Sequence, residues 1–267
     1  MSIHPEYRQF LERKRVVDPM TGLSTIPPLP EAMFGFQRDI TSWSLRRGRA
    51  ALFAGTGLGK TFMELVWGQT IADHTGGMVL LLAPLAVAQQ IIREAAKFGI
   101  PARLVSCQAD CGAGINVTNY QKVERFDLSK FAAVILDESS ILKSTDGHYR
   151  TLLIDACQPI PFRLAATATP APNDFMELGN HAEFLGVMES TDMIQRFFIN
   201  DTMSAGSYRL MGWADTTSDM GFWTWLSSWA VCISKPSDLP GFDDGDFVLP
   251  ELVIEEEMVG VDHTRAF

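Results

Sequence analysis

Residues 54–61, Ala-Gly-Thr-Gly-Leu-Gly-Lys-Thr, have the types and spacing of a loop that binds phosphate groups. A short apolar run, Arg49 to Ala54, precedes the loop, and the pattern predicts a buried strand, a glycine-rich turn and then a helix. Glycines let backbone N–H groups approach phosphate oxygens closely, and a helix N-terminus adds partial positive charge behind them. Ala54 stands where such loops usually begin with glycine, and a small side chain is acceptable there.

The end of this loop carries the side chains that could act on a nucleotide. Lys60 can reach the β- and γ-phosphates, and Thr61 can ligate Mg²⁺. The backbone around the phosphates would come from the preceding residues Gly55, Thr56, Gly57, Leu58 and Gly59. The alternative is an ordinary glycine turn before a helix, although Gly-Lys-Thr after a strand and a loop is a specific combination.

Two carboxylates, Asp137 and Glu138, follow directly after the strongly apolar run 131–136. Asp137 could hold Mg²⁺, usually through water, opposite Thr61. Glu138 could orient and deprotonate an attacking water. Carboxylates at the end of a buried strand carry a desolvation cost, which a metal ion would offset. An acidic helix cap after a core strand is the alternative, and the phosphate-binding loop earlier in the chain argues against it.

A third segment, Thr167-Ala-Thr-Pro170, follows another apolar run that begins at Arg163. The hydroxyls of Thr167 and Thr169 could bond to the acidic pair and to the water that it positions, and so couple nucleotide state to movement elsewhere. The same residues also fit a turn that ends a strand.

These segments require an α/β fold to bring them together. Apolar runs predict strands over 78–84, 102–106, 115–120, 131–136 and from 163 onward. Helical spacing over 86–98, and a helix over 144–156, alternate with those strands. We therefore expect a mostly parallel sheet with helices on both faces.

The chain ends differ from this core. Residues 1–34 are expected to be an irregular or partly helical lead-in. An aromatic-rich helix is predicted over 222–230, with Trp223, Leu226 and Ala230 packed on the core. Residues 236–250 are expected to be a loop, and 252–259 a strand that leaves the domain.

Composition limits the partners. The 267 residues include 22 basic and 32 acidic ones, for a net charge of −10. Nine carboxylates and no Lys or Arg lie between Asp238 and Asp262, so the acidity belongs to the C-terminal stretch. The chain has no overall basic surface of the kind that nucleic-acid-binding domains usually carry. Its four cysteines fit reduced structural thiols better than a zinc site. No apolar run would span a membrane and no signal region is present, so we expect a cytoplasmic protein.

Taken in order, the segments resemble the first RecA-like domain of a superfamily-two helicase or translocase. The nearest likeness is to Swi/Snf-type ATPases, particularly their phage and prophage branch, for which the location would be the host cytoplasm. Two segments that carry the resemblance are the phosphate-binding loop and Asp137-Glu-Ser-Ser140, the acidic box. The others are Phe36-Gln37, Leu82-Ala-Pro-Leu85 with Gln89, Val117-Thr-Asn-Tyr120, Leu142-Lys143, and Thr167-Ala-Thr-Pro170 with Asn173. Ser140 stands where the family often has His, so the bridge from the acidic box to Thr167-Ala-Thr-Pro170 would be weaker or remade by a hydroxyl.

The resemblance implies ATP and Mg²⁺ as cofactors, with Lys60 and Glu138 as catalytic residues and Phe36 and Gln37 at the adenine. It also implies contacts to nucleic acid, double-stranded DNA more than separated strands, through Pro84, Leu85, Thr118, Asn119 and Tyr120. Because the chain is acidic, binding of DNA by this chain alone should be weak.

The resemblance also implies a division of the chain. Residues 35–185 would be the ATP-binding core, 186–250 a helical and loop extension of the same domain, and 251–267 the start of a linker. The family's second RecA-like domain, with its arginine fingers, would lie beyond Phe267, in cis or in trans. Arg150 and Arg163 lie near the site in sequence but fit structural roles better, so hydrolysis by this chain alone should be slow.

Three other functions remain open. The domain could be the motor of a restriction or defence system, which a fused nuclease or methyltransferase would reveal. It could be a regulatory nucleotide-binding module without turnover, against which the intact Asp137 and Glu138 argue. A small-molecule kinase with the same phosphate loop would leave the segments around Thr118 and Thr167 as coincidences.

Overall fold

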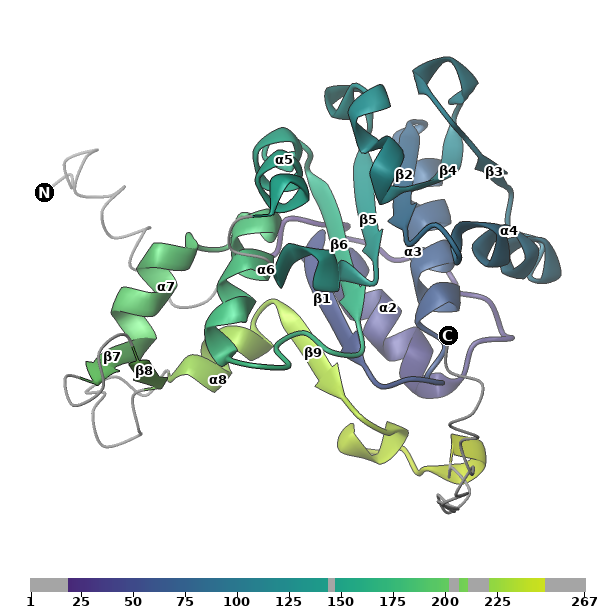
Figure 1. Cartoon of the computed structure of the whole chain (residues 1–267). Coiled ribbons are helices and arrows are strands. Elements are labelled where there is room, and N and C mark those ends of the chain that lie inside the picture. The colour runs from purple at the N-terminus through teal and green to yellow at the C-terminus, as the bar shows by residue number, and fades with distance from the viewer. Residues whose placement is uncertain (1–18, 144–146, 202–206, 211–220, 248–267) are drawn as a thin grey trace, which may run out of the picture.

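The central sheet is parallel and lies between two layers of helices in a computed structural model, which describes residues 19–143, 147–201, 207–210 and 221–247 (Figure 1). In this part of the chain seven strands pair in the order β3-β4-β2-β5-β6-β1-β9. Their bounds are β1 Arg49–Ala54, β2 Met78–Ala83, β3 Ala102–Leu104, β4 Gly114–Asn119, β5 Ala133–Asp137, β6 Phe162–Thr167 and β9 Ala230–Ile233. The expected α/β class and parallel sheet are confirmed.

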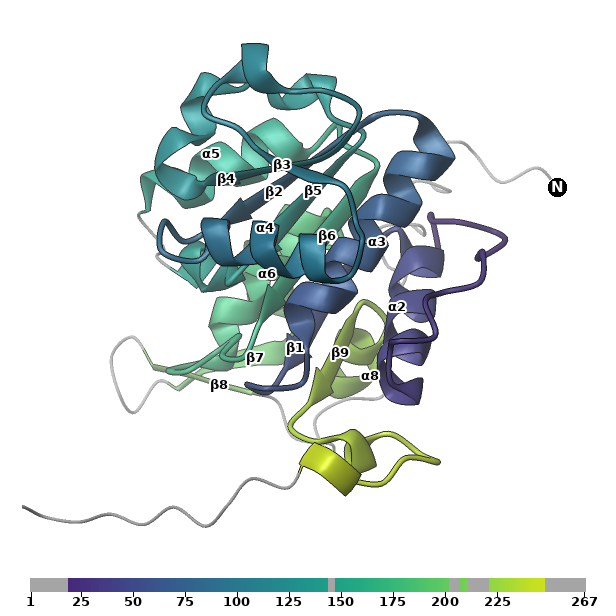
Figure 2. The same cartoon turned by 90° about the vertical axis from the view of Figure 1, so that its right-hand side faces the viewer.

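Helices cover both faces, as expected. One face packs against α2 (Gly35–Arg47), α3 (Lys60–Thr75) and α4 (Ala88–Lys97), and Figure 2 shows α3 and α4 in front of the sheet. The other face packs against α5 (His148–Cys157), α6 (Leu178–Leu185) and α8 (Phe222–Ser227), and α7 (Ser190–Phe197) packs against α6. Successive strand residues alternate between the two layers because side chains in a strand point to opposite faces.

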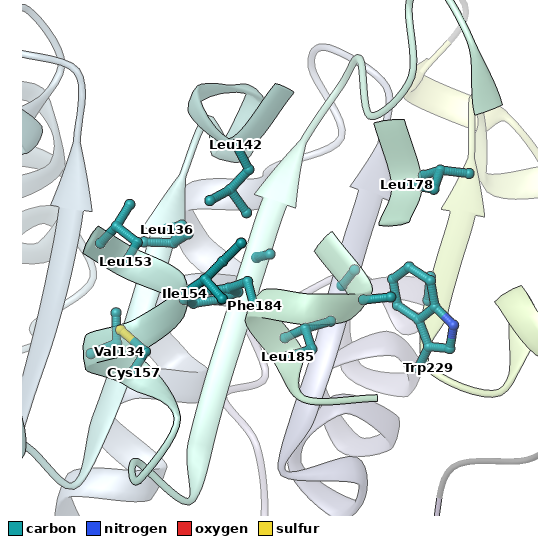
Figure 3. Close-up of a cluster of buried hydrophobic side chains, with 14 of the residues drawn as sticks. Val134, Leu136, Leu142, Leu153, Ile154, Cys157, Leu178, Phe184, Leu185 and Trp229 are labelled. Atoms are coloured by element: carbon teal, nitrogen blue, oxygen red, sulfur yellow. The ribbon is translucent and has the colours of Figure 1, made fainter. Parts of the chain in front are cut away.

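Figure 3 shows part of the second layer, where β5 meets α5 and α6. Val134 and Leu136 point from β5 toward Leu153 and Ile154 of α5, and Phe184 of α6 closes the cluster; all five are buried. This packing fixes the strand that ends in the acidic pair.

The described residues also form short 3₁₀ turns. They are η1 Gln108–Asp110, η2 Tyr120–Arg125, η3 Leu128–Lys130, η4 Ser139–Lys143, η5 Phe175–Glu177, η7 Pro236–Asp238 and η8 Gly245–Phe247. An antiparallel hairpin of β7 (Phe198–Asp201) and β8 (Ser207–Leu210) follows α7 and projects from the α7 side of the domain (Figure 1).

The segment 222–230 differs from the expected single helix. α8 ends at Ser227, and β9 then joins the main sheet beside β1, with Ala51 paired to Ala230 and Ala54 to Ile233. Trp223 is 50% exposed instead of packed on the core, whereas Trp225 and Trp229 are buried. Leu226 and Ala230 are buried as expected. Trp223 is not, because the buried face of α8 consists of Phe222, Trp225 and Leu226.

Part of the expected organisation lies outside the described residues: most of the lead-in (1–18) and the predicted strand 252–259. Within the described ranges, no helix has both the length and the apolar character needed to cross a lipid bilayer.

Candidate nucleotide and metal site

The phosphate-binding loop joins β1 to α3 at the carboxyl edge of the sheet. Gly57 and Gly59 have φ values of +86° and +78°, which explains why glycine is needed there. Gly55 is required for a different reason: its N–H donates to the carbonyl of Ile233 at 2.8 Å, and a Cβ atom would lie 2.9 Å from the carbonyl oxygen of Ser234. Strand β9 therefore supports the start of the loop directly.

Lys60 folds back onto this loop. Its Nζ donates to the carbonyl oxygens of Ala54 at 2.8 Å and Gly55 at 3.2 Å. Among the described residues, the backbone N–H groups of Gly57, Gly59 and Lys60 have no hydrogen-bond partner. The loop thus offers free donors and an ammonium group that phosphate oxygens would draw away from two carbonyls.

Gln37, expected at the adenine, connects α2 to the loop. Its Oε1 accepts the N–H of Phe34 at 3.0 Å, and its Nε2 donates to the carbonyl of Leu58 at 2.9 Å. A Cβ at Gly59 would lie 2.4 Å from Gln37 Nε2, so the glutamine also explains why Gly59 must lack a side chain. Gln37 is buried, and both its amide atoms are engaged by the protein.

Phe36 does not lie where a base could stack on it. Its ring is 2% exposed and packs edge-on against Phe242 at 6.4 Å and Phe247 at 5.2 Å between centroids. The neighbouring Phe34 is 48% exposed and lies 4.9 Å from Phe247. The prediction of direct adenine contact by Phe36 is thus not supported, because the segment that follows β9 returns to cover this ring.

Strand order brings the acidic pair to the loop. β6 lies between β5 and β1, and Phe53 pairs with Thr167 while Asp137 pairs with Ala166. The carboxyl ends of these three parallel strands therefore place the loop, Thr167 and Asp137 along one edge of the sheet.

Asp137 is 8% exposed. Burial, and then the charge of Glu138, raise its pKa to about 6, while Lys60 acts in the opposite direction. A bound cation would stabilise the charged form of such a carboxyl group, which burial and a nearby like charge destabilise. Its position fits the predicted role as a Mg²⁺ ligand, together with Thr61.

Glu138 has a φ of +54°, and no other non-glycine residue in the described segments has a positive φ. Thr167 Oγ1 donates to Glu138 Oε1 at 2.5 Å, and the same hydroxyl accepts the N–H of Thr169 at 3.1 Å. Thr169 is exposed, and its own hydroxyl accepts a hydrogen bond from Lys143 Nζ at 3.2 Å. The structure thus joins the acidic box to both predicted coupling residues.

The bridge expected between the acidic box and Thr167-Ala-Thr-Pro170 is made by the hydroxyl of Thr167, which donates to Glu138, and not by Ser140. Ser139 makes a separate buried contact. Ser139 Oγ and His181 Nε2 lie 3.0 Å apart, and both residues are fully buried. Burial lowers the pKa of His181 to about 4, and its ring packs edge-on against Phe53 of β1 at 5.2 Å. This histidine, on α6, links the acidic box to β1, the strand that precedes the phosphate-binding loop. No sequence motif surrounds His181, so the sequence did not identify it as part of the site.

A second functional candidate, Glu64, was also missed. It lies on α3, one turn after Lys60, is fully buried, and neither of its carboxylate oxygens has a hydrogen-bond partner among the described residues. Burial, and then the charge of Asp137, raise its pKa well above the ordinary value, and Lys60 lowers it. The available signal was a carboxylate on a helix that is otherwise apolar at this end.

The predicted nucleic-acid contacts fall into two groups. Pro84 and Leu85 lie just after β2, and Leu85 is 66% exposed. Thr118, Asn119 and Tyr120 are 1%, 4% and 2% exposed, so the structure does not place them where a DNA strand could touch them. β4 continues directly into η2, whose first residue is Tyr120. The hydroxyl of Tyr120 donates to the carbonyl of Asp137 at 2.8 Å. Tyr120 therefore supports the acidic strand.

Comparison with known proteins identifies structures with a similar fold. The sequence matches no family model, and no curated protein matches it. Among solved structures, it is similar to the Sulfolobus solfataricus SWI2/SNF2 ATPase core in complex with dsDNA, with a TM-score of 0.60 and 16% identity over 79% of this chain. The chain spans 46% of that structure, which is less than half of its length.

Two other similar structures are the UvsW helicase from bacteriophage T4 and the Pyrococcus furiosus Hef helicase domain. The TM-scores are 0.48 and 0.47 and the identities 14% and 18%. The alignments cover 71% of this chain and 67% of UvsW, and 58% of this chain and 37% of Hef. The Sulfolobus structure confirms the expected RecA-like α/β fold. The phage or prophage branch of the resemblance stays a prediction.

Proposed function

We propose that this domain binds Mg-ATP and is the first motor half of an ATP-dependent translocase on double-stranded DNA. The observation that carries the proposal is the meeting of three groups at one edge of the sheet: the phosphate-binding loop, Asp137, and the hydrogen-bonded pair of Glu138 and Thr167. Any one of them occurs in other settings, whereas all three together are what nucleotide hydrolysis requires.

Each residue has a distinct task in this proposal. Loop N–H groups and Lys60 hold the phosphates, and Gln37 fixes the loop from the adenine side through Leu58. Thr61 and Asp137 would hold Mg²⁺, for which the buried, unneutralised carboxyl of Asp137 is suited. The ion would neutralise charge on the phosphates when bound. Glu138 takes a proton from the attacking water, and Thr167 holds its carboxylate in place.

Double-stranded DNA is proposed as the substrate because the Sulfolobus ATPase core of the same fold was solved in complex with it. Pro84 and Leu85 are the proposed contacts to a strand, which the 66% exposure of Leu85 supports. Contacts of this kind bind the backbone and carry no sequence information. Binding by this acidic chain alone should be weak and should fall steeply with added salt, as anisotropy with a labelled duplex would measure.

The nucleotide part is tested by calorimetry with Mg-ATP. Lys60→Ala should abolish tight binding, because a charged contact to the polyphosphate is lost in a partly dehydrated loop. Lys130→Ala is the matched control, since this lysine is exposed and pairs only with Asp127 among the described residues. Equal affinities of the wild type and Lys60→Ala would refute the assignment.

A further inference from the structure

Glu64 is a buried carboxyl group for which the fold itself offers no partner. It is 0% exposed on α3, and its Oε1 and Oε2 lack hydrogen-bond partners among the residues that the structure describes. An unpartnered buried carboxyl destabilises a domain, and an apolar side chain of similar volume would pack there without that cost. The position is therefore better explained by a ligand than by packing.

The direction in which Glu64 points follows from the packing of α3. Gly68, four residues later, is on the same helix face, and a Cβ atom there would lie 3.0 Å from Ile135 Cδ1 and 3.3 Å from Ile115 Cδ1. Because α3 leads from the carboxyl end of β1 back to the start of the parallel strand β2, it runs against the strands. Glu64 is thus one turn nearer the carboxyl edge, where Asp137 is the next inward residue after Ile135.

The sheet beneath Glu64 carries a row of three residues on this face. Ala83 of β2 pairs with Asn119 of β4, and because Leu82 pairs with Leu136, Ala83 also lies beside Asp137. Ala83, whose side chain is only a methyl group, therefore lies between these two polar residues in the sheet. Asn119 is 4% exposed, and its Oδ1 has no hydrogen-bond partner among the described residues.

The charges around Glu64 favour a cation. The ionisable groups that act on Glu64 are Asp137, Lys60, Glu138 and Glu94, which is one ammonium group against three other carboxyls. A nucleotide would add further negative charge and occupy Lys60. Oxygen ligands of this kind, with retained water, are what Mg²⁺ prefers.

We propose that Glu64 is a further acidic residue of the cation site, with its oxygens accepting hydrogen bonds from the water shell of a divalent cation held by Thr61 and Asp137. Asn119 Oδ1 is the second acceptor for that shell. The inference rests on the proposed function, since it assumes that this cation accompanies a nucleotide. It assigns Glu64 a positioning role with no direct contact to the reacting atoms.

The test measures Mn²⁺ binding by electron paramagnetic resonance in the presence of a non-hydrolysable ATP analogue, and separately measures affinity for the analogue with EDTA. Glu64→Gln keeps the shape of the side chain and removes its charge. It should weaken Mn²⁺ binding about 10-fold, the usual effect of losing a partner in the second coordination shell. In EDTA its affinity for the analogue should stay equal or rise, because one negative charge near the triphosphate is gone.

Two further variants complete the design. Glu64→Met fills the position with an apolar chain and should weaken Mn²⁺ binding at least as much, while its melting temperature should not fall below that of the wild type. Glu94→Gln removes a partly exposed carboxylate on α4 and should change Mn²⁺ affinity less than about 2-fold. A purely structural role of Glu64 would lower both affinities together.

The outcomes separate the two proposals. If the wild type binds Mn²⁺ with the analogue and both Glu64 variants bind it within 2-fold of the wild type, the role of Glu64 is refuted and the proposed function stands. If the wild type binds no analogue with or without Mn²⁺, the proposed function fails, and the role of Glu64 fails with it.

Discussion

The hydroxyl of Thr167 donates to Oε1 of Glu138 at 2.5 Å, from the strand that lies between the phosphate-binding loop and the acidic box. Thr167 is fully buried at the end of β6, so its side chain is held by the sheet. The proposed base is therefore oriented by a residue whose strand pairs with both β1 and β5. A shift of either strand against β6 would change the position of the carboxylate.

The first prediction follows from that bond. Thr167→Val should leave ATP affinity unchanged and slow hydrolysis of bound ATP about 10-fold, which corresponds to the loss of one hydrogen bond to a charged group. Thr167→Ser keeps the hydroxyl and should restore most of the rate. Single-turnover assays with radiolabelled ATP measure this step. A Val variant as fast as the wild type would show that the bond does not orient the base.

A second prediction concerns the backbone of Glu138, whose φ of +54° is unfavourable for a residue with a side chain. Glu138→Ala and Glu138→Gly both remove the carboxylate, but only glycine accepts this conformation without strain. The Gly variant should be more stable than the Ala variant by about 1 kcal/mol, against the usual order for these two residues. Urea denaturation measures the difference. Greater stability of the Ala variant would contradict the left-handed conformation.

The raised pKa of Asp137, about 6 against an ordinary value of 3.8, gives a third prediction. Between these values the folded state holds a proton that the unfolded state has lost, so this group lowers stability as the pH rises from about 4 to 6. Without metal, Asp137→Asn should be more stable than the wild type by about 3 kcal/mol at pH 7.5 and nearly equal to it at pH 4. A difference that does not vary with pH would refute the assignment.

The fourth prediction concerns turnover. Arg150 donates to Asn180 and Glu183, and Arg163 donates to the carbonyl of Phe184, so both arginines near the acidic box in sequence serve the fold. An arginine that stabilises the transferred phosphate is worth on the order of 10³-fold in rate. The chain alone should therefore bind ATP but hydrolyse it very slowly, with or without DNA. A steady-state assay that found rapid, DNA-stimulated hydrolysis would place such an arginine within these residues.

Much of the fold could be predicted from the sequence, because the central parallel strands β1, β2, β5 and β6 are buried along nearly their whole length and are therefore largely apolar runs. Residues 78–84 and 163–166 correspond closely to β2 and β6. β9 could not be predicted, since its residues continue an aromatic segment and become a strand only by pairing with β1. The hairpin of β7 and β8 gave no clear alternation in the sequence.

The candidate site, like the fold, could be predicted from the sequence only in part. The loop, Asp137, Glu138 and Thr167 were predicted because their spacing is set by chemistry within one segment. Phe36 and Asn119 were placed by resemblance, but their burial depends on the distant segments that cover them. His181 and Glu64 were missed because a single buried polar residue gains meaning only from its neighbours in space.

The most direct test of the central claim is a crystal structure of this chain with Mg²⁺ and a non-hydrolysable ATP analogue. The account predicts the β- and γ-phosphates on the N–H groups of residues 57–61, with Lys60 Nζ moved from the carbonyls of Ala54 and Gly55 onto the phosphates, and the ion between Thr61 and Asp137. A nucleotide bound elsewhere, or a Lys60 still bonded to those carbonyls beside a bound triphosphate, would contradict it.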